Sequence, residues 1–289
     1  MITEIANQQS SEIRLRDGGK LHYVVDDYTD PWSTPDAVIM LHGIAEEAAV
    51  WRPWAVHLAR DYKVFRVDLR GFGQSSAIPT DRSFTIADWA DDIERLVETE
   101  GLKRVHIVSA KLGALIAFEL AQQQPSWIGS ITLAGMLTSP KRSLEKWVDE
   151  WIKLVDRGGV EQWARQTMPG RMADNLTPEA TQWWIDLMGA QPAASVNHCF
   201  RLLPSIEGPA NPEGVRCPAL FIGASGGAYL ADSYNQRPET SDLQALQKRV
   251  VNSQFKSVDA NSYHIAATHP DQCAQITLAF LSELNRSHG

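Results

Sequence analysis

The sequence predicts an α/β fold built on a mostly parallel, doubly wound sheet with helices on both of its faces. Three observations support this prediction. Short apolar segments alternate with segments of helical spacing, the run at 37–41 is apolar throughout, and the alternation is interrupted between residues 137 and 212. A short, wholly apolar run suits a strand buried on both faces, and regular strand–helix alternation implies parallel pairing through crossover helices.

The first elements follow one another in a regular order. Two alternating segments, Glu12–Arg16 and Lys20–Asp26, flank the turn Asp17-Gly18-Gly19 and predict a β-hairpin. After the strand at 37–41 we expect a helix around 51–59, a strand at 63–67, a helix at 86–99, a strand before Lys111, a helix after it and a strand at 130–134.

The alternation changes in the segment between residues 137 and 212. Its spacing is helical and it is rich in tryptophan, with Trp147, Trp151, Trp163, Trp183 and Trp184. The earlier pattern then resumes with a strand at 218–223, a helix at 241–251, a strand at 255–258 and a helix from 271. We therefore expect a core of residues 1–136 and 213–289 and a helical lid of residues 137–212.

The composition narrows the range of partners. The chain has 289 residues, 44% of them hydrophobic, and a formal charge of -8 with no basic stripe, which argues against nucleic acid or an anionic membrane as a partner. Its three cysteines lack metal-type spacing. Residues 1–11 are polar and lack the basic start and apolar run of a signal peptide, and no apolar run in the sequence approaches the length of a membrane span. We expect a cytoplasmic protein without a metal or other cofactor, and a homodimer is left open.

Four motifs occur in the order of one fold superfamily. They are His42-Gly43, the segment from Asp68 to Gly73, the turn centred on Lys111, and His264. Together they resemble the α/β-hydrolase superfamily, in particular its branch of enol-lactonases, carbon–carbon bond hydrolases and haloperoxidase-type esterases. The resemblance covers nearly the whole chain outside the expected lid and implies the α/β-hydrolase fold.

The turn at Lys111 departs from the pattern of this superfamily. The family motif is G-x-S-x-G, whereas here Ser109 replaces the first glycine, Gly113 keeps the second, and Lys111 stands where the nucleophilic serine would be. The resemblance also implies an oxyanion hole formed by the backbone N–H groups of Leu112 and Ile44. Because these donors belong to the backbone, a change of the central side chain need not remove them.

Lys111 has three interpretations. It is an inactivating or engineered replacement, a covalent or proton-transfer group for a keto substrate, or a charged binder for a substrate carboxylate. A helix N-terminus disfavours a cation and, together with burial, lowers the pKa of a lysine. A neutral amine can add to a carbonyl group and form a Schiff base.

The other two members of a hydrolytic triad differ in how well they match. His264 lies in the loop after the last strand, where the resemblance implies the general base. Gly226 stands about where the family carries its aspartate, and the nearest acid downstream is Asp232, which also suits a helix start. A serine-hydrolase cycle is therefore not expected.

Glu46 and Glu47 are unusual in a loop where the superfamily favours small residues. One of them could pair with Lys111, although both could equally be solvated or lie at a helix N-terminus. Two adjacent side chains do not easily both point inward. An ion pair would keep Lys111 charged and would count against a Schiff base.

These features predict an enzyme that acts on a small apolar or aromatic carbonyl compound. Lys111 and His264 would assist carbon–carbon cleavage, decarboxylation or isomerisation of a keto acid, with Trp147 and Trp151 lining the pocket. Glu46, Glu47 and Asp232 are the candidate charge partners. Two alternatives stay open: an ordinary ester, lactone or carbon–carbon hydrolase with an inactivating Ser-to-Lys change, and a non-catalytic ligand-binding protein.

Overall fold

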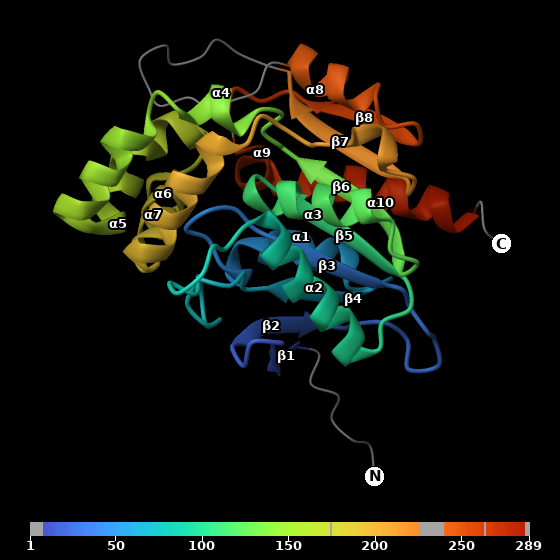
Figure 1. Cartoon of the computed structure of the whole chain (residues 1–289). Coiled ribbons are helices and arrows are strands. Elements are labelled where there is room, and N and C mark those ends of the chain that lie inside the picture. Colours follow the sequence, from blue (N-terminus) through green and yellow to red (C-terminus); the bar gives the residue numbers. More distant parts are fainter. Residues whose placement is uncertain (1–7, 174, 226–239, 263, 287–289) are drawn as a thin grey trace.

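A single twisted sheet organises the protein (Figure 1). The computed structural model describes residues 8–173, 175–225, 240–262 and 264–286. Its eight strands have the order β1-β2-β4-β3-β5-β6-β7-β8, with antiparallel pairing of β1 with β2 and of β2 with β4 and parallel pairing thereafter. The strands are β1 (Gln8–Arg14), β2 (Lys20–Asp26), β3 (Ala37–Leu41), β4 (Lys63–Val67), β5 (Val105–Ala110), β6 (Ile128–Ala134), β7 (Ala219–Ala224) and β8 (Ser253–Val258).

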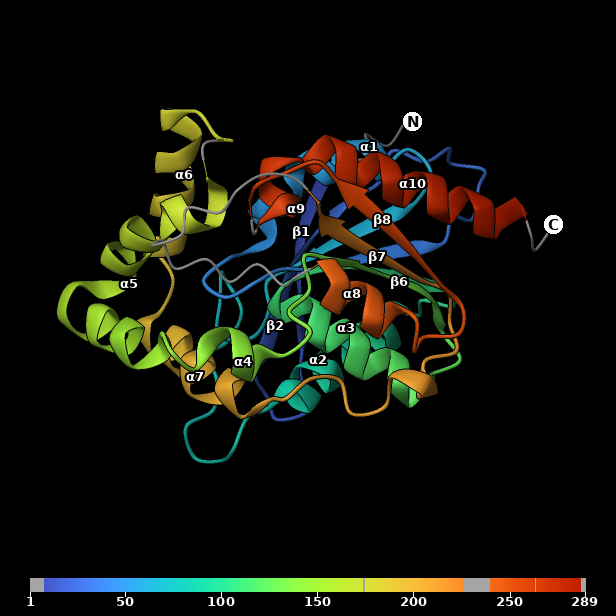
Figure 2. The same ribbon diagram turned by 90° about the horizontal axis from the view of Figure 1, so that it is seen from above.

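Helices cover both faces of the sheet, as the alternation predicts (Figure 2). On one face lie α1 (Arg52–Leu58), α9 (Ile265–Thr268) and α10 (Pro270–Arg286), and on the other lie α2 (Ile86–Glu100), α3 (Leu112–Gln123) and α8 (Thr240–Gln247). A short 3-10 helix, η1 (Ala48–Trp51), precedes α1. β3, β5 and β7 are buried at every residue because both faces of the central sheet are covered.

A group of helices lies to one side of the sheet (Figure 1, left). The chain between β6 and β7 forms α4 (Pro140–Leu144), α5 (Val148–Met172), α6 (Pro178–Gly189), α7 (Ala193–Leu202), η2 (Leu203–Ser205) and η3 (Pro212–Gly214). Trp151, Trp163 and Phe200 pack together here, with ring centroids 5.0 to 5.9 Å apart. Two of the five tryptophans of this segment, Trp151 and Trp163, are therefore accounted for by its own packing.

The boundaries of several elements differ from those expected by a few residues, and local turns explain two of these differences. The first strand was expected at Glu12–Arg16 but spans Gln8–Arg14, because Leu15 and Gly18 already take part in the backbone hydrogen bonds of the following turn. The helix expected over residues 241–251 ends at Gln247, where a turn closes with a 2.9 Å bond from the N–H of Val250 to the carbonyl of Gln247. Neither shift moves a candidate site residue.

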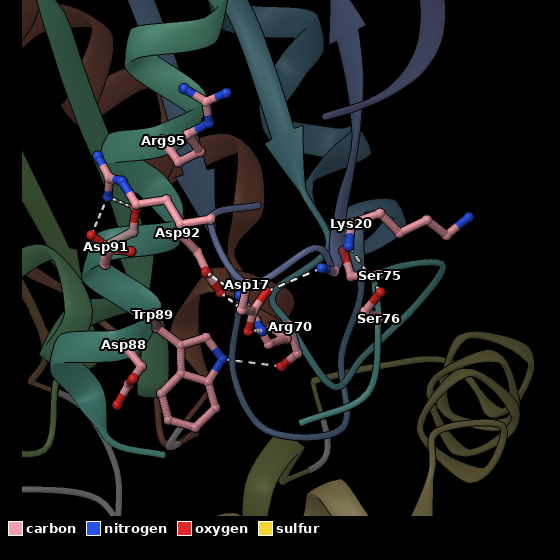
Figure 3. Close-up of polar contacts among 12 residues, drawn as sticks. Asp17, Lys20, Arg70, Ser75, Ser76, Asp88, Trp89, Asp91, Asp92 and Arg95 are labelled. Atoms are coloured by element: carbon pink, nitrogen blue, oxygen red, sulfur yellow. Dashed lines mark hydrogen bonds and ion pairs between the residues drawn. The ribbon is translucent and has the colours of Figure 1, made fainter. Parts of the chain in front are cut away.

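A buried charge cluster anchors the loop after β4 (Figure 3). The guanidinium group of Arg70 donates to the Asp92 carboxylate over 2.8 and 2.6 Å and also to Asp17. The carbonyl of Arg70 accepts a 3.0 Å bond from the indole N–H of Trp89. Burial, with the nearby charge of Asp17 and against the attraction of Arg70, raises the pKa of Asp92 to about 6. The cluster ties the loop to α2 and to the β1–β2 turn.

Candidate active site

Lys111 occupies the sharp turn between β5 and α3. Its backbone has φ 53° and ψ -112°, a conformation that costs a non-glycine residue energy and persists only where the surroundings enforce it. The start of α3 packs closely against the end of β3, and this requires glycine at position 113. A Cβ at Gly113 would lie only 2.1 Å from the carbonyl oxygen of Leu41. The N–H of Gly113 also donates to the carbonyl of His42 over 2.9 Å. The turn thus holds Lys111 on the wall of a cavity.

Glu46 brings Lys111 and His264 together. Its Oε1 atom lies 2.8 Å from Nζ of Lys111 and 3.0 Å from Nε2 of His264, while Oε2 accepts a 2.9 Å bond from the backbone N–H of Gly43. The three side chains are buried, with Lys111 6%, Glu46 1% and His264 3% exposed. A methyl group at Gly43 would lie 2.8 Å from Glu46 and 2.9 Å from Lys111, so the glycine makes room for the pair.

The electrostatics of this cluster favour a partly neutral lysine. Burial, opposed by Glu46 and assisted by the charge of Arg171, lowers the pKa of Lys111 to about 8. Burial acts to raise the pKa of Glu46, but Lys111 and His264 outweigh it and hold that pKa well below its ordinary value. Burial and the charge of Lys111 lower the pKa of His264 to about 4. The ion pair therefore exists, yet it does not keep Lys111 as basic as an ordinary lysine.

The partner of His264 decides its tautomer. A neutral imidazole carries one N–H group, and an ionised carboxylate can only accept hydrogen bonds. Because Glu46 is ionised and faces Nε2, that nitrogen carries the proton and Nδ1 does not. In a hydrolytic triad the histidine nitrogen beside the nucleophile must accept a proton. The contact with Glu46 thus opposes the usual role of this histidine.

The cavity beside Lys111 is lined mainly by apolar side chains. Trp151, Trp163 and Phe200 contribute from α5 and α7, and the two residues implied as oxyanion donors, Ile44 and Leu112, also line it. It offers about 20 Å³ to the centres of water-sized molecules, which is room for roughly one water. Among the described residues, the space beside Lys111 is therefore smaller than a small organic molecule.

Arg171 is a further cation on this cavity, which the sequence analysis did not identify. Its side chain is fixed by a 3.0 Å bond from Nε to Oγ1 of Thr167 and by a position 4.3 Å from the ring centroid of Trp163. Its carbonyl accepts a 3.1 Å bond from the N–H of His264. An arginine on a helix is usually solvated, so no signal in the sequence distinguished it.

The other predicted site residues are placed as follows. Glu47 accepts a 3.1 Å hydrogen bond from the side-chain amide of Gln191. Trp151 lines the cavity, whereas Trp147 is not among the described residues that line it and has Nζ of Lys146 4.6 Å from its ring centroid. Asp232 lies outside the described residues.

Two kinds of feature are absent from the part of the chain that the structure describes. No group of three or more histidine, cysteine, aspartate or glutamate side chains is placed to hold a metal ion. No helix in the described ranges has both the length and the apolar character needed to cross a membrane.

Comparisons with known proteins agree with the α/β-hydrolase fold. A family model described as alpha/beta hydrolase fold matches residues 36–166. A putative carbamate hydrolase RutD from Variovorax paradoxus (strain S110) is 30% identical over 140 residues, which are 48% of this chain and 51% of that protein. The chain thus spans about half the length of that relative.

Two longer matches are to enol-lactonases, one of the classes named in the resemblance. The 3-oxoadipate enol-lactonase 1 of Acinetobacter baylyi (strain ATCC 33305 / BD413 / ADP1) is 21% identical over 252 residues, covering 86% of this chain and 89% of that protein. The crystal structure of the enol-lactonase from Burkholderia xenovorans LB400 has a TM-score of 0.80 at 17% identity and covers 94% of this chain and 100% of that one. The protein has the α/β-hydrolase fold, as expected.

Proposed function

We propose that this protein is an enzyme that uses the amine of Lys111 as a covalent group on a small carbonyl compound. The observation that supports the proposal best is the position of Lys111. It lies on the turn between β5 and α3, where the resemblance implies the nucleophile, and it is buried on a cavity wall in contact with Glu46. The reaction we propose is carbon–carbon cleavage, decarboxylation or isomerisation of a keto acid through a Schiff base.

The lowered pKa makes Lys111 a usable nucleophile at neutral pH. With a pKa of about 8, roughly a tenth of the side chain is neutral at pH 7, whereas an ordinary lysine is neutral in roughly one molecule in 3,000. The Schiff base formed with a ketone withdraws electrons and stabilises the carbanion that bond cleavage or proton removal leaves behind. Hydrolysis of the product imine restores the amine.

The cavity supports a substrate that is both apolar and anionic. The aromatic rings from α5 and α7 favour an apolar or aromatic body. Lys111 and Arg171 contribute two basic side chains to the lining of the cavity. A carboxylate on the substrate would bind favourably beside them. We propose that α4–α7 form the lid of this site and admit the substrate by moving.

The principal alternative is a hydrolase that has lost its serine, and the names of the relatives favour it. We expect Lys111→Ser to hydrolyse p-nitrophenyl acetate within tenfold of the rate of Lys111→Ala. Glu46 keeps the proton on Nε2 of His264, so this nitrogen cannot accept a proton from the serine. A working Ser–His pair would add about 100-fold or more. Such a gain in Lys111→Ser would favour a recently inactivated hydrolase.

Reductive trapping tests the proposed function directly. The protein is incubated with phenylpyruvate and cyanoborohydride, and the adduct is mapped by mass spectrometry. We expect a stable adduct at Lys111 in the wild type and none at that site in Lys111→Met, with labelling of surface lysines equal in the two proteins. Phenylpyruvate that binds tightly without an adduct would instead favour a ligand-binding protein.

A further inference from the structure

Both carboxylate oxygens of Glu46 have hydrogen-bond partners within the protein. One oxygen faces the amine of Lys111 and the imidazole of His264, the other is held by the N–H of Gly43, and the side chain is 1% exposed. The carboxylate thus lies in contact with the group that would react and out of contact with bulk water. A carboxylate placed in this way can pass protons to and from an amine without help from solvent.

His264 is poorly placed to perform that task. Its Nε2 atom donates to Glu46, so the nitrogen that faces the reaction cannot accept a proton until it has first lost one. Its backbone is fixed as well, because the N–H donates to Arg171, and its ring lies 5.1 Å from the ring of Trp184. These contacts hold the imidazole in one orientation, with its N–H directed at Glu46.

From this geometry we propose that Glu46 is the proton-transfer residue of the site and that His264 is the positioning residue that orients it. The inference rests on the proposed function, since it assigns the proton transfers of Schiff-base formation at Lys111. It reverses the roles that the resemblance to hydrolases implies, in which the histidine is the base and an acid orients it.

The proposed steps balance as follows. Glu46 takes a proton from the ammonium group of Lys111, which leaves a neutral amine beside a neutral acid. The amine attacks the carbonyl carbon, a nitrogen–carbon bond forms, and a proton from nitrogen moves to the former carbonyl oxygen to give a carbinolamine. Glu46 then donates its proton to that hydroxyl group, the carbon–oxygen bond breaks, and water leaves. The nitrogen lone pair completes the iminium ion beside the regenerated carboxylate.

Two reagents of similar size separate this role from a simple effect on the amine. Acetic anhydride needs only a neutral amine, whereas pentane-2,4-dione also needs the carbinolamine to lose water. In Glu46→Gln the attraction that raises the pKa of Lys111 is lost. We therefore expect acetylation of Lys111 at pH 7 to be at least as fast as in the wild type. We expect enaminone formation with the diketone to become about 100-fold slower.

The outcomes distinguish this inference from the proposed function. If wild-type Lys111 forms no enaminone, the proposed function fails first. If the wild type reacts and both reagents modify Glu46→Gln equally fast, Glu46 has no proton-transfer role and only the present inference is overturned. Circular dichroism of each variant establishes that it is folded before the rates are compared.

A pair of His264 variants tests the positioning role. In His264→Gln the side-chain amide can still donate to Glu46, whereas in His264→Ala no donor remains. We expect the glutamine variant to form the enaminone within about tenfold of the wild-type rate and the alanine variant to be much slower. Equal loss in both variants would mean that the imidazole itself transfers protons, which would overturn the inference.

Discussion

Gly113→Ala is expected to yield little or no folded protein, with a loss of at least about 4 kcal/mol of stability. The added Cβ would lie 2.1 Å from the carbonyl oxygen and 2.5 Å from the carbonyl carbon of Leu41, both backbone atoms. The helix cannot easily withdraw, because the N–H of Gly113 is bonded to the carbonyl of His42. Urea unfolding of the soluble fraction measures the loss.

Gly101→Ala is the matched control for this substitution. Gly101 ends α2 with φ 62°, and a Cβ there would meet nothing within 4 Å, so the change tests backbone strain without a clash. We expect it to cost about 1 kcal/mol. If Gly113→Ala costs no more than Gly101→Ala, the close approach of α3 to β3 is not what holds the turn at Lys111.

Arg70→Met is expected to destabilise the protein by about 3 to 5 kcal/mol, because it leaves the carboxylate of Asp92 buried without its cation. Both carboxylate oxygens of Asp92 now accept from this guanidinium group. The double variant Arg70→Met/Asp92→Asn removes the stranded charge and should recover part of the loss. Thermal and urea unfolding of the two variants give the comparison.

The loss of stability in Arg70→Met should depend on pH, and the pKa of Asp92 gives the direction. The pKa of Asp92 is about 6 in the folded protein, above its ordinary value of 3.8. Between these values the folded state holds a proton that the unfolded chain has lost, so stability falls as the pH rises through this window. Without Arg70 the folded pKa rises further and the fall extends to higher pH. The deficit of Arg70→Met should be smaller at pH 4 than at pH 8, and a deficit independent of pH would contradict this account.

The fold could be predicted from the sequence because its signals are local. Apolar runs such as 37–41 and 218–223 sit in a sheet covered on both faces, and burial on both faces permits no alternation. The small residues around Lys111 are likewise a local signal, because they allow α3 to pack closely against β3 next to a single turn. The ends of strands and helices were predicted less accurately, because turns such as 15–19 compete with the strand for the same backbone hydrogen-bonding groups.

The candidate site could be predicted only in part. Lys111 and His264 follow from the order of motifs along the chain, but the sequence offered Glu46 and Glu47 as equal partners. The structure separates them: Glu46 is 1% exposed and bonded to Lys111, whereas Glu47 accepts a bond from Gln191. The tautomer of His264 and the presence of Arg171 depend on contacts between segments far apart in sequence, which no local pattern records.

The titration of Lys111 tests the central claim most directly. Trace acetylation with acetic anhydride over a pH series, followed by mass spectrometry of the Lys111 peptide, gives the fraction of neutral amine at each pH. We expect a midpoint near pH 8, in line with the pKa of about 8, while surface lysines titrate near 10.5. A midpoint for Lys111 that coincides with those of the surface lysines would show an ordinary charged side chain and would contradict covalent catalysis by this residue.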